Sequence, residues 1–300
     1  MTTVGHHTRV VRAERPAVVE TNGVELCLQT FGDESAPAIL LIAGAACSMD
    51  WWEEELCERL AAGPRFVIRY DLRDTGQSVT YEPGAPQYNG DDLVADAVGV
   101  LDALELQRAH VVGLSMGGGI AQHLVLHHPD RVASLTLAST SPGASGPDEP
   151  DLPPMSKELA AVEPPSEPDW SDDDAVVDYV VAGLFPYAGS VHFDEDRMRA
   201  LVARIVDRTI DMRSTMTNHW LIEGGEPIRT RLDEIRAPTL VLHGTEDPLF
   251  PIAHGEALAE KIPGARLIPL EGVGHEFPPR EVWDVVVNAL RDHTAEDREG

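Results

Sequence analysis

The sequence has few cysteines and no long apolar run. Its 300 residues include only Cys27, Cys47 and Cys57, too few for a disulfide framework and not spaced as a zinc site. The longest apolar stretch, residues 38–47, has the length of a strand, whereas a membrane helix needs roughly 18 residues. No apolar segment follows the basic residues near the N-terminus, so no secretory signal is expected. These features predict a cytoplasmic protein with reduced thiols.

Basic residues are also scarce, and lysine occurs only at Lys157 and Lys261. The chain has 51 acidic and 23 basic residues, which gives a formal net charge of −28. Such a charge disfavours binding to nucleic acid and to anionic membrane surfaces, because both carry negative phosphates. No spacing of histidine, cysteine or carboxylate side chains suggests a metal site, and no cofactor is implied. The expected partner is a small molecule, and a homodimer is compatible with the sequence.

Short apolar segments alternate with helical patterns in residues 17–140 and 231–293. This alternation predicts an α/β fold with a mostly parallel central sheet and helices on both faces. Between these stretches, residues 141–230 begin with many Pro, Asp, Glu and Ser residues and continue with helical patterns, so they are expected to form an inserted helical cap. Residues 1–16 and 294–300 are expected to be flexible tails. The expected strands are 18–20, 24–31, 38–43, 65–70, 109–114, 132–138, 239–243 and 266–270. The expected helices include 51–62, 92–104, 175–184, 196–210, 214–222, 252–261 and 282–291.

A serine lies between two glycines at the junction of an expected strand and helix. The segment reads Gly113-Leu114-Ser115-Met116-Gly117, after the apolar strand 109–114 and before a helical pattern. A tight strand-to-helix turn would leave no room for side chains at the two glycines and would expose the serine oxygen. The helix N-terminus would also point free N–H groups at developing negative charge. A plain turn is the alternative, but the flanking strand and helix favour Ser115 as a nucleophile.

A serine nucleophile needs a base and an orienting acid, which should follow at the ends of later strands. Asp247 comes just after the expected strand 239–243, and His275 follows the next strand in a glycine-rich loop. Taken singly, each could be an ordinary loop residue, but together they occur in the required order. Glu246 competes for the acid role, and its position one residue nearer the strand favours Asp247. Ser115, Asp247 and His275 are therefore the expected catalytic residues.

The backbone should supply two donors to an oxyanion. One is the N–H of Met116, directly after the serine, and the other is expected at Ala45, in the loop after the strand 38–43. Cys47 lies near the same loop and is expected to line the pocket without acting as a nucleophile.

These motifs resemble the α/β-hydrolase fold superfamily over nearly the whole chain, from about Val18 to His293. The loop "RYDLRDTGQS" has Asp74 where glycine is usual, and Ala43-Gly44 replaces the usual His-Gly. These variants resemble the aclacinomycin methylesterase-like branch, whose members hydrolyse a methyl ester on a bulky aromatic polyketide. The resemblance implies a serine esterase that forms an acyl-enzyme. A lactonase acting on a large macrocyclic or aromatic lactone, a C–C bond hydrolase, an amidase and a non-catalytic binding protein remain as alternatives.

The cap is expected to select the substrate, since its larger apolar residues stand among acidic and proline-rich stretches. A wide apolar pocket would require such side chains, although any one of them could simply pack the cap's own core. The expected substrate-binding residues are Phe185, Tyr187, Met216 and Trp220, with Met212 as a further candidate.

Overall fold

Eight strands form one sheet in the structure, a computed structural model that describes residues 15–143, 152–191 and 193–295. The strand order is β1-β2-β4-β3-β5-β6-β7-β8, with antiparallel pairing of β1 with β2 and of β2 with β4, and parallel pairing elsewhere. The strands are β1 (Ala17–Thr21), β2 (Val24–Phe31), β3 (Ala38–Ile42), β4 (Phe66–Tyr70), β5 (Ala109–Leu114), β6 (Val132–Ala138), β7 (Thr239–Gly244) and β8 (Arg266–Leu270). The predicted fold class, with a mostly parallel sheet, is confirmed.

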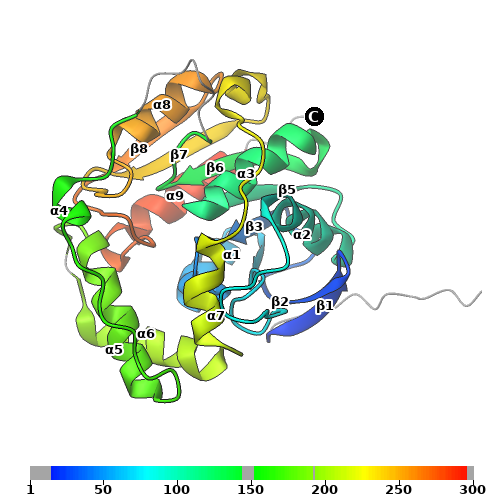
Figure 1. Ribbon diagram of the computed structural model, residues 1–300. Coiled ribbons are helices and arrows are strands. Elements are labelled where there is room, and N and C mark those ends of the chain that lie inside the picture. The colour runs from blue at the N-terminus through cyan, green and yellow to red at the C-terminus, as the bar shows by residue number, and fades with distance from the viewer. Residues whose placement is uncertain (1–14, 144–151, 192, 296–300) are drawn as a thin grey trace, which may run out of the picture.

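Helices cover both faces of this sheet (Figure 1). Helices α2 (Gly90–Ala103), α3 (Met116–His127) and α8 (Ala253–Lys261) pack on one face, and α1 (Glu54–Ala61) and α9 (Trp283–His293) pack on the other. The central strand β3 is buried along its whole length, and its side chains alternate between the two cores. This alternation follows from the two-residue period of a strand, and a strand covered on both faces is apolar throughout.

The segment between β6 and β7 adds helices beyond the sheet, of which α5 and α6 lie side by side (Figure 1). Its helices are α4 (Lys157–Ala160), α5 (Asp173–Leu184), α6 (Glu195–Arg208) and α7 (Met212–Thr217). Apolar side chains of α5 and α6 form a separate core that includes Trp51 from the sheet domain. Acidic N-cap residues satisfy free backbone donors at the starts of α5, α6 and α7, so acidic composition here favours helix formation.

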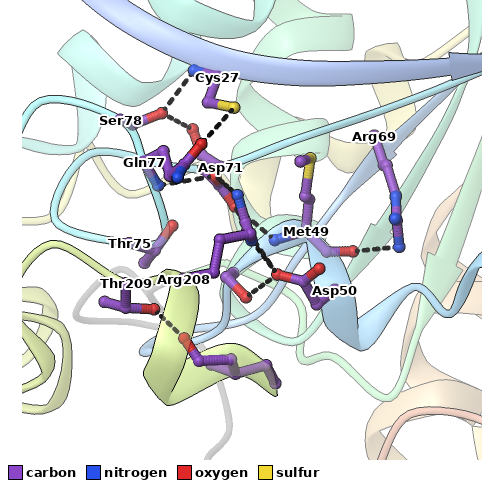
Figure 2. Close-up of polar contacts among 12 residues, drawn as sticks. Cys27, Met49, Asp50, Arg69, Asp71, Thr75, Gln77, Ser78, Arg208 and Thr209 are labelled. Carbon is purple, nitrogen blue, oxygen red and sulfur yellow. Dashed lines mark hydrogen bonds and ion pairs between the residues drawn. The ribbon is translucent and has the colours of Figure 1, made fainter. Parts of the chain in front are cut away.

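An ion-pair cluster ties α6 to two loops of the sheet domain (Figure 2). Arg208 lies between Asp50 and Asp71, and its Nε donates to Asp50 Oδ2 at 2.8 Å while its Nη1 donates to Asp71 Oδ2 at 2.8 Å. Asp71 is fully buried and also accepts the backbone N–H of Met49 at 2.8 Å. The cluster therefore fixes the end of α6 against the loops that follow β3 and β4.

Two expected helices begin or end elsewhere. The helix predicted over 51–62 is split into a 3-10 turn, η1 (Met49–Trp51), and α1, because Met49 is held by Asp71 and the chain turns at Trp52. The helix predicted over 214–222 begins earlier as α7 and ends in the 3-10 turn η4 (Asn218–Trp220). Asp211 accepts the Ser214 N–H and so sets the earlier start.

Most of the predicted tails lies outside the described residues, which begin at 15 and end at 295. At the C-terminal end, Thr294 is buried, and its Oγ1 accepts a hydrogen bond from Arg65 Nε at 2.8 Å. No helix among the described residues is both long enough and apolar enough to cross a membrane.

Candidate active site

The site forms where the strand order changes direction. In the sheet, β4 lies on one side of β3 and β5 lies on the other. The chain segments that leave the carboxyl ends of β3 and β5 therefore run over opposite faces of the sheet. The carboxyl ends of these two strands are adjacent, since Ile42 pairs with Gly113. Open α/β sheets place their ligand sites at such a point. The loop after β3 and the turn after β5 therefore meet there.

Ser115 occupies the tight turn between β5 and α3. Its φ of 53° lies in the left-handed region, which is strained for a residue with a side chain. A Cβ at Gly113 would lie 2.2 Å from the Gly117 carbonyl oxygen, and one at Gly117 would lie 2.5 Å from the Ala43 carbonyl oxygen. The glycines are therefore required by close backbone approach, as the sequence predicted. Thr140 supports the turn, because its Oγ1 donates to the Ser115 carbonyl oxygen at 2.8 Å.

A chain of hydrogen bonds links the three residues singled out in the sequence. The Ser115 hydroxyl lies 3.0 Å from His275 Nε2, and His275 Nδ1 lies 2.8 Å from Asp247 Oδ2. An ionised carboxylate only accepts, so Nδ1 carries the proton and Nε2 is left to accept from Ser115. This arrangement can remove the serine proton during attack on a carbonyl.

Asp247 is held in place by the backbone that follows it. Its Oδ1 accepts the N–H groups of Leu249 at 2.9 Å and Phe250 at 2.8 Å, which leaves Oδ2 for His275. His243 lies close by, with Nε2 3.7 Å from Asp247 Oδ2, but that nitrogen is only 2.7 Å from the Phe250 carbonyl oxygen. Burial lowers the pKa of His243, so it is neutral there and does not compete with His275 for the carboxylate.

Glu246, the alternative acid, points elsewhere. Its Oε2 accepts the Ser190 backbone N–H at 2.7 Å, and its Oε1 accepts the Ser190 hydroxyl at 2.8 Å. It therefore connects the β7 loop with the inserted segment.

Of the two predicted oxyanion donors, Met116 directly follows Ser115 and Ala45 lies in the loop after β3. Met116 is the first residue of α3, where backbone N–H groups lack helical acceptors. Ala45 follows Gly44, at which a Cβ would lie 3.4 Å from Ser115 Cβ. Among the described residues, neither the Ala45 nor the Met116 N–H donates to another protein group. Both N–H groups are thus available to a ligand beside Ser115.

The residues predicted to bind the substrate or line the pocket have different surroundings. Tyr187 is half-buried with its ring 6.2 Å from that of His275, whereas Phe185 and Trp220 are each 67% exposed. Met216 packs against the cap core, in which Met212 is also buried. Cys47 is half-buried between that core and the sheet, and burial raises its thiol pKa to about 12. A thiol of that pKa is a poor nucleophile at neutral pH.

Two neighbours of the site were not identified from sequence. Phe250 packs its ring edge-on against His275, with centroids 5.3 Å apart, and follows Asp247 by only three residues. His219 accepts the Ala46 N–H at 2.9 Å, although the two residues are 173 positions apart in the chain. Proximity to Asp247 could have suggested Phe250, but no local signal marks His219.

The chain matches known proteins over most of its length. The family model for the alpha/beta hydrolase fold matches residues 37–279. Rhodomycin D methylesterase DauP of Streptomyces sp. (strain C5) is 34% identical over 292 residues, covering 92% of this chain and 97% of that protein. Rhodomycin D methylesterase DnrP of Streptomyces peucetius is 33% identical with the same coverage. The solved structure of Est816, described as an N-acyl homoserine lactone degrading enzyme, has a TM-score of 0.67 and 26% identity, and the match covers 92% of this chain and 99% of that one.

These matches agree with the family inferred from the motifs around Ser115, Asp247 and His275. The similarity to two methylesterases also agrees with the predicted branch. The chain belongs to the α/β-hydrolase fold family and, within it, is similar to rhodomycin D methylesterases.

Proposed function

We propose that the protein hydrolyses a carboxylic methyl ester on a bulky aromatic compound through an acyl-enzyme at Ser115. The observation that carries this proposal is the hydrogen-bonded chain from Ser115 through His275 to Asp247. The methyl ester is suggested by the 34% identity to a methylesterase over nearly the whole chain.

The proposed reaction has two steps of acyl transfer. His275 Nε2 takes the Ser115 proton while Oγ attacks the ester carbonyl, and Asp247 stabilises the resulting imidazolium. The Ala45 and Met116 N–H groups bind the oxyanion of the tetrahedral intermediate. As this intermediate collapses, His275 gives the proton to the leaving oxygen and methanol departs. Water, activated by His275, then attacks the acyl-enzyme and releases the acid.

Aromatic side chains of the inserted segment support a bulky substrate. Tyr187 lies beside His275, while Phe185 and Trp220 expose large apolar surface on the same segment. Buried core side chains cannot meet a ligand directly, so Met212 is better explained by packing of the cap. Ligand sites are lined mainly by hydrophobic and aromatic side chains. We propose that Tyr187, Phe185, Trp220, Met216 and Cys47 contact the substrate.

A panel of defined esters tests this function. Methyl anthraquinone-2-carboxylate and methyl 2-naphthoate represent bulky aromatic methyl esters, methyl butyrate a small aliphatic one, and phthalide an aromatic lactone. Methanol and acid release would be followed by mass spectrometry, with Ser115→Ala as the blank. We expect the largest kcat/KM for the aromatic methyl esters, because remote contacts can be used in the transition state. A preference for methyl butyrate would refute substrate selection by the aromatic residues.

A lactonase is the second candidate, favoured by the likeness to Est816. The same nucleophile and oxyanion donors would serve a lactone, in which the alcohol remains attached to the product acid. Faster turnover of phthalide than of methyl 2-naphthoate would select this candidate.

We also propose that the core comprises residues 17–140 and 231–293, with 141–230 as a cap over Ser115, and that the protein acts in the cytoplasm. Three free cysteines suit a reducing compartment. Reporter fusions would test the location. Size-exclusion chromatography with light scattering would test the predicted homodimer.

A further inference from the structure

One part of the inserted segment is fixed to the sheet domain independently of α5 and α6. The Ile210 N–H donates to the Gly76 carbonyl oxygen at 2.9 Å. Two hydroxyl groups also donate to carbonyl oxygens at 2.6 Å, that of Ser214 to Tyr81 and that of Thr215 to Asp74. Ser214 and Thr215 are buried. Residues 210–219 are therefore anchored on the loop that follows β4.

Asp74 is the centre of this anchorage. Its carboxylate accepts the Tyr88 hydroxyl at 2.7 Å, the Tyr81 N–H at 2.6 Å and the Asn218 side-chain amide at 3.0 Å. Asn218 is fully buried and also accepts the Gly84 N–H at 2.7 Å. Because the Asn218 side chain makes hydrogen bonds with both its donor and its acceptor atoms, its position is fixed, and the backbone of the next residue, His219, is restrained with it.

His219 joins this anchored segment to the loop that follows β3. The imidazole is 4% exposed, with Nε2 2.9 Å from the Arg73 carbonyl oxygen and Nδ1 2.9 Å from the Ala46 backbone nitrogen. A carbonyl only accepts, so Nε2 carries the proton and the bare Nδ1 accepts the Ala46 N–H. Arg73 is itself fixed, because its guanidinium donates two hydrogen bonds to Asp96, at 2.7 and 2.8 Å.

Ala46, which donates this hydrogen bond to His219, has an unfavourable backbone conformation. Ala46 has a φ of 58°, in the left-handed region that residues with a Cβ avoid. The hydrogen bond to His219 fixes the peptide plane between Ala45 and Ala46, and so restrains the backbone rotation of Ala46 and of Ala45 before it. It also occupies the Ala46 N–H, whereas the Ala45 N–H donates to no protein group among the described residues.

We propose that His219 is a positioning residue for the oxyanion loop, holding Ala46 in its left-handed conformation so that the Ala45 N–H points at the reacting carbonyl. This proposal rests on the proposed function, because it assigns a role within that esterase mechanism. The inserted segment would then contribute to transition-state stabilisation as well as to substrate choice.

Three replacements separate the two hydrogen bonds of His219. His219→Asn places an amide oxygen near the position of Nδ1 and keeps an acceptor for Ala46, whereas His219→Gln reaches the position of Nε2 and keeps a donor for Arg73. His219→Phe removes both bonds with a ring of similar size. Ser214→Ala is the matched control, since it removes an anchoring bond of the same segment without touching the loop that contains Ala45.

The assays are turnover of the best aromatic methyl ester and inhibition by 2-naphthylboronic acid, which forms a tetrahedral anionic adduct with an active serine. Thermal melts identify variants that have lost the fold. Removal of one oxyanion donor lowers kcat by about 100-fold or more, so mispositioning of that donor by His219→Phe should lower kcat by about tenfold or more with little change in KM. The boronate inhibition constant should rise in parallel. His219→Asn should retain more activity than His219→Gln, and Ser214→Ala should lower only the melting temperature.

The outcomes distinguish the two proposals. If wild-type protein neither turns over the esters nor binds the boronate, both the esterase assignment and the role of His219 fail. If wild type is active, the role of His219 alone is overturned in either of two cases. In the first, folded His219→Phe keeps kcat and boronate affinity within twofold. In the second, His219→Gln is as active as wild type while His219→Asn is not.

Discussion

Replacing Asp74 by glycine should destabilise the protein, although glycine adopts the left-handed backbone conformation of this position more easily. Asp74 has a φ of 63°, so glycine would relieve left-handed backbone strain of about 1–2 kcal/mol. The same change removes a fully buried carboxylate that accepts three hydrogen bonds. It leaves the Tyr88 hydroxyl and the Asn218 amide buried without that partner. The two effects oppose each other, and their relative sizes decide whether the free energy of unfolding rises or falls.

Hydrogen bonds to a charged group contribute about 1.5–3 kcal/mol each. With three such bonds at the lower value, the loss exceeds the relief of strain, and the unfolding free energy should fall by about 3 kcal/mol. For a chain of this size, such a loss should lower the melting temperature by roughly 6–12 °C.

The assay is urea denaturation followed by circular dichroism, with Glu105→Gly as the matched control. Glu105 is also acidic and left-handed, with a φ of 55°, but it is exposed, and within the described ranges its carboxylate makes no hydrogen bond or ion pair. The control should be unchanged or more stable by up to about 1 kcal/mol. Asp74→Gly with the stability of wild type would refute the account, because strain would then outweigh the network.

Three further results are expected. Asp247→Asn should lower kcat by about 10⁴-fold, as loss of the orienting carboxylate does in serine hydrolases, whereas Glu246→Gln should have little effect. Steady-state kinetics measure both variants, and the reverse result would make Glu246 the partner of His275. Burial lowers the pKa of His219 in the fold, so unfolding takes up a proton below its ordinary pKa of about 6.5, and stability should fall as pH drops below that value. Urea midpoints for His219→Asn should fall less steeply over this range, and an equal slope would contradict a buried neutral imidazole. Because the pKa of Cys47 is raised to about 12, iodoacetamide at pH 8 should leave turnover intact, and rapid inactivation with alkylation of Cys47 would contradict that raised pKa.

Local patterns were sufficient to predict the strands and the tight turn around Ser115. Alternating strands and helices gave the fold class because buried parallel strands are apolar throughout, and β5, β6 and β8 lie where they were expected. The glycines around Ser115 could be interpreted because their cause, close backbone approach, lies within a few residues. Asp247 and His275 could be proposed since strand ends converge at one edge of the sheet.

The parts that were not predicted depend on contacts between distant segments. The 3-10 turn before α1 is held by Asp71, which lies 22 positions after Met49, so the helical pattern alone did not predict the break between this turn and α1. Asp74 stood out in sequence, but its partner Asn218 is 144 positions away. His219 had no visible signal because its role depends on a loop that the insert reaches only in the folded chain. Helix and strand propensity and hydrophobic periodicity describe neighbouring residues, so they carry no information about contacts between segments that are far apart in the chain.

Covalent trapping tests the central claim, that Ser115 carries the acyl group, most directly. Wild-type protein would be mixed with methyl anthraquinone-2-carboxylate, quenched in acid within milliseconds, digested and mapped by mass spectrometry. We predict that the peptide containing Ser115 gains the mass of the anthraquinone acyl group, that methanol appears with it, and that Ser115→Ala shows neither. A folded Ser115→Ala protein that still releases methanol at a substantial fraction of the wild-type rate, or an acyl group on another residue, would contradict the account.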